Sequence, residues 1–214
     1  YPQRVEAFLS AEVTAGRIFG PFDEPPFDEM DIIPLGVTNK ADMDISIHGR
    51  VITHFSKTHE NGQSLNGEVP TEASTITFTR WANMISSCVR LRSEGGNPVG
   101  MATDVVNAFR NIRVHPDHIR LCGYKFKDKF YYDGSLPFGA SANPRNFDLL
   151  AQAVHYILEK ALADDDIICD CHHLLDDFAL IAFNELHAHL AFAVLKTVLQ
   201  SWSPDAPQKD YSAN

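Results

Sequence analysis

The sequence has no long hydrophobic run, few cysteines and a shortage of basic residues. No stretch approaches 18 uninterrupted apolar residues, so we expect no membrane-spanning helix in these 214 residues. Four cysteines, Cys88, Cys122, Cys169 and Cys171, predict reduced thiols in an intracellular setting, cytoplasmic or nuclear, and not a disulfide framework. The 18 Lys and Arg residues against 28 Asp and Glu give a net charge of −10, which argues against a protein that coats nucleic acid.

Familiar motifs are also missing. The sequence contains no Ser-His-Asp elbow, P-loop, dinucleotide fingerprint, internal repeat or low-complexity tract. Its 44% hydrophobic and 21% charged residues are ordinary for a globular protein, and the length predicts one compact unit or one unit with a subdomain. Because the chain begins with Tyr1 and has no leader, we expect it to be a segment of a longer protein.

Turn signals and β-branched stretches predict three hairpins. Residues 32–37 and 50–55 form the first, and Lys127 and Asp128 mark the turn of the second. Residues 174–183 read as two strands that meet at Asp176 and Asp177. Residues 1–30, with their prolines and acids, are expected to form an N-terminal extension.

Hydrophobic periodicity predicts helices over 77–92, 146–162 and 184–199. The first should bury Phe78, Trp81, Ile85, Cys88 and Val89, and we interpret Trp81 as a core residue in preference to a base-stacking platform. The order of elements predicts an α+β fold, an antiparallel sheet with helices on one face.

Charge is unevenly distributed. The segment 110–129 is basic, whereas residues 161–177 are acidic, with Asp164, Asp165, Asp166, Asp170, Asp176 and Asp177 and no base. The basic side chains of the first segment are Arg110, Arg113, Arg120, Lys125, Lys127 and Lys129. This distribution suits a protein that handles both a polyanion and metal cations, although a solvated charged hairpin explains the basic segment as well.

Three segments carry candidate chemistry. Asp104 ends an apolar strand, residues 135–147 form a glycine-containing loop before a long helix, and Asp176 and Asp177 lie between apolar stretches. Buried carboxylates repel one another, and hard divalent cations such as Mg²⁺ relieve that repulsion. Two such ions held by acids would serve phosphoryl transfer, provided that a sheet brings Asp104 and Asp176 together.

In their order and spacing these three segments resemble motifs A, B and C of reverse transcriptases. The wider sequence is similar to the reverse transcriptase of DIRS-like, tyrosine-recombinase retroelements, with Asp104, Ala108, Phe109 and Arg110 in the first motif and Leu-Asp-Asp-Phe at 175–178 in the last. The matching segments, in order, are 16–22, 33–37, 50–56, 62–66, 104–116, 131–139 and 175–178.

The resemblance implies a right-hand polymerase fold without a thumb in this segment. The fingers would comprise 31–68 and 112–143, and the palm would comprise 69–111 and 144–214. It also implies RNA-directed DNA synthesis with two Mg²⁺ or Mn²⁺ ions as cofactors. The implied partners are an RNA or DNA template-primer, deoxynucleoside triphosphates, and the thumb, RNase H and recombinase parts of a polyprotein, with no membrane.

The resemblance assigns site residues by position. Asp104, Asp176 and Asp177 would be catalytic, with Asp104, Asp176 and the backbone carbonyl of Val105 as metal ligands. Phe109 would stack under the incoming sugar and reject a 2′-hydroxyl. The other implied nucleotide contacts are Lys40 and Arg50 at phosphates, Phe138 and Gly139 at nucleotide and template, and Lys209 as proton donor to pyrophosphate.

Departures from the family pattern leave a second hypothesis open. Leu174 and Leu175 replace an aromatic residue, and Ala102, Asn143 and Asn39 replace a common Lys, Ala and Pro. The alternative is a catalytically inactive remnant that acts at most as a binding domain.

The run 169–173, Cys-Asp-Cys-His-His, suggests a zinc site. It lacks a second pair of ligands, however, and alternate burial along a strand explains the run better.

Overall fold

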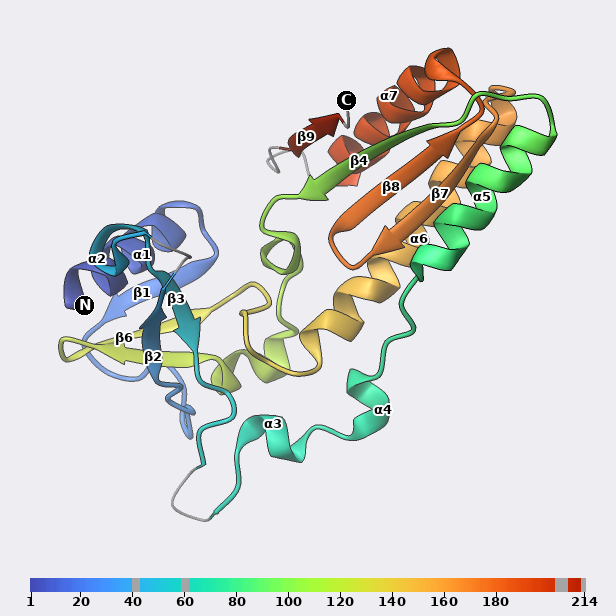
Figure 1. Cartoon of the computed structure of the whole chain (residues 1–214). Coiled ribbons are helices and arrows are strands. Elements are labelled where there is room, and N and C mark those ends of the chain that lie inside the picture. The colour runs from blue at the N-terminus through green and yellow to red at the C-terminus, as the bar shows by residue number, and fades with distance from the viewer. Residues whose placement is uncertain (40–42, 59–61, 203–207, 213–214) are drawn as a thin grey trace. The chain divides into compact units, whose positions relative to one another are not determined.

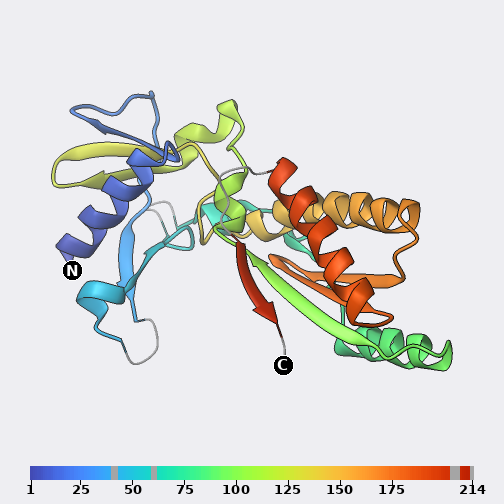
Figure 2. The ribbon, with the colours of Figure 1, turned by 90° about the horizontal axis from the view of Figure 1, so that it is seen from above.

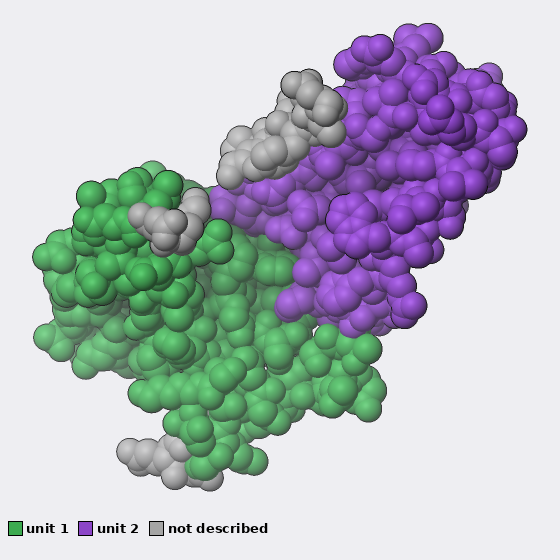
Figure 3. All heavy atoms as spheres, viewed as in Figure 1, with its two compact units in different colours: residues 1–75, 109–143 green, residues 76–108, 144–214 purple. Residues whose placement is uncertain are grey.

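The structure, a computed structural model, describes residues 1–39, 43–58, 62–202 and 208–212, with side chains described up to residue 201 (Figure 1). The chain forms two compact units, each assembled from two chain segments (Figure 3). Unit 1 comprises Tyr1–Thr75 and Phe109–Asn143, and unit 2 comprises Ile76–Ala108 and Pro144–Asn214. The boundaries that we predicted for fingers and palm fall near these limits, except that residues 1–30 belong to unit 1.

The N-terminal residues form regular structure that the sequence analysis did not predict. Helix α1 spans Pro2–Thr14, and strand β1 spans Ile18–Phe22. Pro2 suits the first turn of a helix, where its missing N–H needs no partner. Val5 and Leu9, one turn apart, are buried together with Ile18 in the core of the unit. This narrow apolar stripe in a polar helix escaped detection, so the separate N-terminal extension is corrected to a part of unit 1.

Two antiparallel sheets complete unit 1, and both predicted hairpins are confirmed. Strands β2 (Leu35–Thr38) and β3 (Arg50–Thr53) pair with each other. Strands β5 (Gly123–Phe126) and β6 (Lys129–Asp133) pair across Lys127 and Asp128, and β1 joins them in the order β1-β6-β5. Lys127 and Asp128 have φ of 48° and 59°, the left-handed conformation that a two-residue hairpin turn requires. Short helices α2 (Ile45–His48), α3 (Leu65–Glu68) and α4 (Thr71–Ser74) and the 3₁₀ turns Ala108–Asn111 and Pro116–Leu121 connect the strands.

A buried ion network crosses the core of unit 1. The guanidinium of Arg110 lies 2.8 Å from Glu12 and 2.5 Å from Asp133, and the hydroxyl of Tyr124 donates to Asp133. Burial raises the pKa of Asp133, although the charge of Arg110 opposes this shift. Arg110 was part of the predicted basic segment. Its charge is instead used inside the unit, where a paired buried cation is required to compensate buried acids.

Unit 2 contains one four-stranded antiparallel sheet in the order β7-β8-β4-β9. Strand β4 spans Val99–Val105, and the strands β7 (Cys169–Leu174) and β8 (Asp177–Ala182) form the predicted third hairpin. Strand β9 (Gln208–Ser212) pairs with the other edge of β4. The helices are α5 (Trp81–Ser93), α6 (Asn143–Asp164) and α7 (Glu185–Trp202), and the side chain of Asn184 caps α7 by accepting from the backbone N–H of His187. Among the described residues, no helix has the length and apolarity needed to cross a membrane.

The helices of unit 2 cover both faces of the sheet. Helices α6 and α7 lie on one face, and α5 lies on the other (Figure 2). Neighbouring residues of β7 show the same division, because His172 contacts Ser87 of α5 and His173 contacts His155 of α6. Our prediction that the helices lie on one face is therefore wrong for α5.

Helix α5 also turns a different side inward from the one predicted. Its buried residues are Ser87 and Leu91, whereas Trp81 is 80% exposed, Ile85 is 61% exposed and Val89 is 64% exposed. The apolar periodicity identified the helix correctly, but small and aliphatic residues of the opposite side make its contact with the sheet. The interpretation of Trp81 as a core residue is wrong.

Candidate active site

Two of the predicted catalytic acids lie directly opposite each other in unit 2. Asp104 near the end of β4 is the register partner of Asp177 at the start of β8. Paired residues of adjacent strands point to the same face of a sheet, with Cβ atoms about 4.5–5.5 Å apart. Strand pairing thus brings together acids of the first and third motifs that are distant in sequence. The register partner of Asp104 is Asp177, however, and not Asp176, the acid that we expected to share the metal ions with Asp104.

The third acid lies in the turn between β7 and β8. Asp176 is half-buried, and its backbone carbonyl accepts a hydrogen bond of 2.9 Å from the N–H of Val105. This bond ties the tip of the hairpin to the end of β4. Leu175, which precedes Asp176, has φ of 55°, an unfavourable conformation for a leucine. Such strain costs about 1–3 kcal/mol and is concentrated at functional sites, where it holds a turn in one shape.

The electrostatics of the cluster disfavour three negative charges. Burial is the main cause that raises the pKa of Asp176, and the carboxylates of Asp104 and Asp177 raise it further, against a hydrogen bond from its own backbone N–H. Burial and the charge of Asp104 also raise the pKa of Asp177. A divalent cation would relieve this repulsion, and carboxylate oxygen is the ligand that Mg²⁺ prefers.

The donor chemistry of this acidic cluster, Asp104, Asp176 and Asp177, therefore fits a hard divalent cation. In the parts of the chain that the structure describes, no three His, Cys, Asp or Glu side chains converge in metal-binding geometry. The match between the acidic cluster and a divalent cation thus rests on the pairing of the acids and on their mutual repulsion, and not on an assembled set of ligands. Two further predicted residues lie beside them, since Val105 ends β4 as a buried residue and Lys209 of β9 is the backbone register partner of Asp104.

A hollow that the sequence analysis missed borders the cluster. It has a volume of about 510 Å³ and lies between the start of α5 and strands β4 and β8. Its lining is mostly apolar and includes Trp81, Met84, Leu174 and Phe178, with Asp177 among the lining residues. The sequence feature that could have indicated the hollow is Leu174, an apolar residue beside the acidic turn. In the structure this side chain is 41% exposed.

The remaining described site residues belong to unit 1. Phe109 and Phe138 pack edge to face with ring centroids 5.5 Å apart. The loop of Phe138 and Gly139 is held against β3, because Thr53 donates a hydrogen bond to the carbonyl of Phe138 and Asn66 donates one of 2.9 Å to that of Gly139. Gly139 has φ of 98°, and a Cβ there would lie 2.5 Å from the carbonyl oxygen of Thr53. Only glycine fits this loop.

Arg50 begins β3 of the same unit as an exposed residue. Unit 1 thus contains the proposed nucleotide contacts Phe109, Phe138, Gly139 and Arg50, and unit 2 contains the acidic cluster. The last predicted contact, Lys40, lies outside the described residues.

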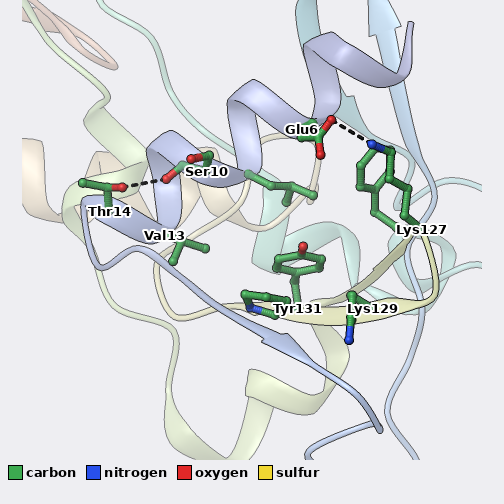
Figure 4. A pocket seen from close by; sticks show the side chains of 10 residues that line it. Glu6, Ser10, Val13, Thr14, Lys127, Lys129 and Tyr131 are labelled. Carbon is green, nitrogen blue, oxygen red and sulfur yellow. Dashed lines mark hydrogen bonds and ion pairs between the residues drawn. The ribbon is translucent and has the colours of Figure 1, made fainter.

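A second cavity, of about 520 Å³, lies in unit 1 between α1 and the β5–β6 hairpin (Figure 4). Its lining includes Lys127, Lys129, Ser10, Thr14 and Tyr131. Both lysines are engaged in ion pairs. Lys127 lies 2.8 Å from Glu6, and Lys129 pairs with Asp23. The cavity therefore offers no surplus positive charge from these lysines.

Comparison with known proteins adds no relative to this description: no family model matches the sequence, and a search of curated proteins finds no match either.

Proposed function

We propose that the chain is the fingers and palm part of an RNA-directed DNA polymerase of the reverse transcriptase type. Unit 1 would be the fingers and unit 2 the palm of a right-hand polymerase fold. The observation that carries the proposal is the pairing of Asp104 with Asp177 beside the strained turn of Asp176. The sequence motifs that resemble this enzyme family place acids at these same positions.

The proposed reaction is template-directed nucleotidyl transfer. Two bound Mg²⁺ ions would activate the primer hydroxyl and stabilise the leaving pyrophosphate. Asp104 and Asp176 are the proposed ligands together with the carbonyl of Val105, and Asp177 adds negative charge that favours cation binding. Lys209, whose backbone runs beside Asp104, is the proposed proton donor to pyrophosphate.

Residues of unit 1 would bind the incoming deoxynucleoside triphosphate. Arg50, with Lys40, would hold its phosphates through charge-assisted hydrogen bonds. The ring of Phe109 is held by Phe138, which supports the proposal that it blocks a 2′-hydroxyl. Gly139 would allow close approach of the backbone to nucleotide and template.

Primer extension tests the proposal. We expect Mg²⁺-dependent extension of a DNA primer on an RNA template with deoxynucleotides, and no extension by the Asp176→Asn variant or in EDTA. Asp165→Asn removes an exposed acid of the same unit outside the proposed site and is the matched control, with activity expected to be unchanged. Equal background from wild type and Asp176→Asn would refute the enzyme and favour the inactive remnant.

A further inference from the structure

Two histidines meet between α6 and β7 in unit 2, away from the residues used above. Nδ1 of His155 lies 2.9 Å from Nδ1 of His173, and the two rings are nearly perpendicular, with centroids 5.1 Å apart. The side chains are largely buried, with 22% of His155 and 12% of His173 exposed. His173 belongs to the run of cysteines and histidines that the sequence analysis examined for zinc.

The opposite nitrogen of each ring faces a carboxylate. Nε2 of His155 lies 3.2 Å from Glu159, one turn along α6, and Nε2 of His173 lies 3.5 Å from Asp148. Asp148 is buried, and its other oxygen accepts a hydrogen bond of 2.7 Å from Gln152. An ionised carboxylate only accepts hydrogen bonds, so each Nε2 must carry a proton to interact favourably.

This arrangement leaves two lone pairs facing each other. A neutral imidazole that carries its proton on Nε2 has a bare lone pair on Nδ1. Two such lone pairs at 2.9 Å repel unless one ring instead carries its proton on Nδ1 and donates it to the other, or a metal ion binds both nitrogens. Burial, and next the charge of His155, lower the pKa of His173 against the charge of Asp148, so His173 takes up a second proton less readily than a free imidazole.

We propose that His155 and His173 form a two-histidine site for a borderline divalent cation, Zn²⁺ in the first place. Zn–N bonds measure about 2.0–2.1 Å, so both Nδ1 atoms can reach one ion at an angle of about 90°. Widening their separation by about 0.4 Å gives the tetrahedral angle, with water in the remaining positions. The carboxylates then have the role that metal-binding histidines usually require, accepting from the second ring nitrogen and fixing the ring orientation.

The neighbouring sulfur ligands are not part of this site. Among the described residues, no third His, Cys, Asp or Glu side chain joins the two histidines in metal-binding geometry, so Cys169 and Cys171 are not placed in the site. His172 points to the other face of the sheet, where it contacts Ser87. The proposed pair thus joins two elements, unlike the zinc motif along one strand that the sequence analysis considered and set aside.

The inference is independent of the proposed polymerase activity. Zn²⁺ held by His155 and His173 would join α6 to β7, and a ligand that binds only the folded state stabilises it. Imidazole nitrogen favours Zn²⁺, Cu²⁺ and Ni²⁺, whereas the acidic cluster offers oxygen ligands for Mg²⁺. The two sites can therefore be tested separately by the choice of cation.

Calorimetric titration of the untagged, metal-stripped chain with zinc chloride tests the site. We expect one zinc ion to bind to the wild type and to raise its melting temperature, and magnesium chloride to leave the histidine site unaffected. His155→Gln should remove this binding, and Glu159→Gln should weaken it about 10-fold, because a neutral amide accepts a weaker hydrogen bond from Nε2 than a carboxylate does. His189→Gln changes an exposed histidine of α7 and should bind as the wild type does.

Thermal melting in EDTA verifies that each variant is folded. His173→Asn removes the other proposed zinc ligand and should also abolish zinc binding. Absence of zinc binding by the wild type, or equal binding by wild type and His155→Gln, would overturn the proposal. Neither result would bear on magnesium-dependent primer extension, which is measured without zinc.

Discussion

At the scale of single residues, the acidic cluster lowers the stability of the folded protein. Asp104 and Asp177 are register partners, their charges raise the pKa of Asp176, and the turn that presents Asp176 contains a leucine with positive φ. Both features cost free energy in the folded protein, and neither is explained by packing. The arrangement is understandable if the cluster binds a cation, because the cation then recovers the electrostatic part of the cost.

This cost predicts that removing one acid stabilises the protein. The raised pKa of Asp176 means that the folded state binds more protons than the unfolded state between the ordinary carboxyl pKa and the raised one. Stability therefore falls as pH rises through this window and stays reduced above it. We expect Asp176→Asn to raise the free energy of unfolding at pH 7 in EDTA by about 0.5–2 kcal/mol.

Urea unfolding between pH 4 and pH 8 measures this effect. The difference between wild type and Asp176→Asn should grow as the pH rises, whereas the exposed control Asp165→Asn should stay within about 0.5 kcal/mol of the wild type. A variant less stable than the wild type at pH 7 would show that Asp176 contributes favourable contacts and that repulsion is not the dominant effect.

At the scale of elements, turn chemistry was the most informative part of the sequence. The hairpins at Lys127–Asp128 and at Asp176–Asp177 were predicted because polar turn residues interrupt apolar strands. The second turn lies one residue earlier than predicted, at Leu175–Asp176, because Asp177 already pairs as the first residue of β8. Pairing of Asp104 with Asp177 required a sheet register that no local pattern fixes, and the resemblance to a known family indicated only that these acids belong to one site. The same limit applies to His155 and His173, whose contact joins a helix to a strand.

Helix faces were predicted less well, for a physical reason. Helix α5 has two sides that can be buried, and the more apolar one is exposed. Helix α6 likewise leaves the apolar residues Leu149 and Ile157 about half exposed. Periodicity identifies a helix but does not specify which neighbour covers it, because that depends on tertiary contacts.

The orientation of α5 can be tested by paired truncations. Leu91 is fully buried, so we expect Leu91→Ala to cost about 2–5 kcal/mol of unfolding free energy. Trp81 is 80% exposed, and Trp81→Ala should change the same quantity by less than about 0.5 kcal/mol despite the larger side chain. Denaturant unfolding of both variants measures the contrast. The reverse order of costs would mean that α5 packs through the face predicted from the sequence.

At the scale of the whole molecule, the net charge of −10 must be reconciled with binding to a polyanion. Four of the six basic side chains of the predicted segment are engaged in ion pairs. Arg110 is buried between acids, and Lys125, Lys127 and Lys129 pair with Asp128, Glu6 and Asp23. The interpretation of this segment as a solvated charged hairpin is therefore the better one for these lysines. Affinity for a template-primer would have to come from bound divalent cations and from the basic side chains that are not engaged in these ion pairs.

This charge distribution predicts weak, magnesium-dependent binding with a shallow dependence on salt. Each phosphate contact by a basic side chain adds about −0.9 to the slope of log affinity against log salt concentration, so proteins with 6–10 contacts show steep slopes. We expect a much shallower slope here, and markedly weaker binding in EDTA than in magnesium chloride. Fluorescence anisotropy of a labelled primer-template at several salt concentrations measures both. Glu6→Gln, which releases Lys127 from its ion pair (Figure 4), should steepen the slope. Steep, magnesium-independent binding by the wild type would instead reveal a basic surface that dominates the negative net charge.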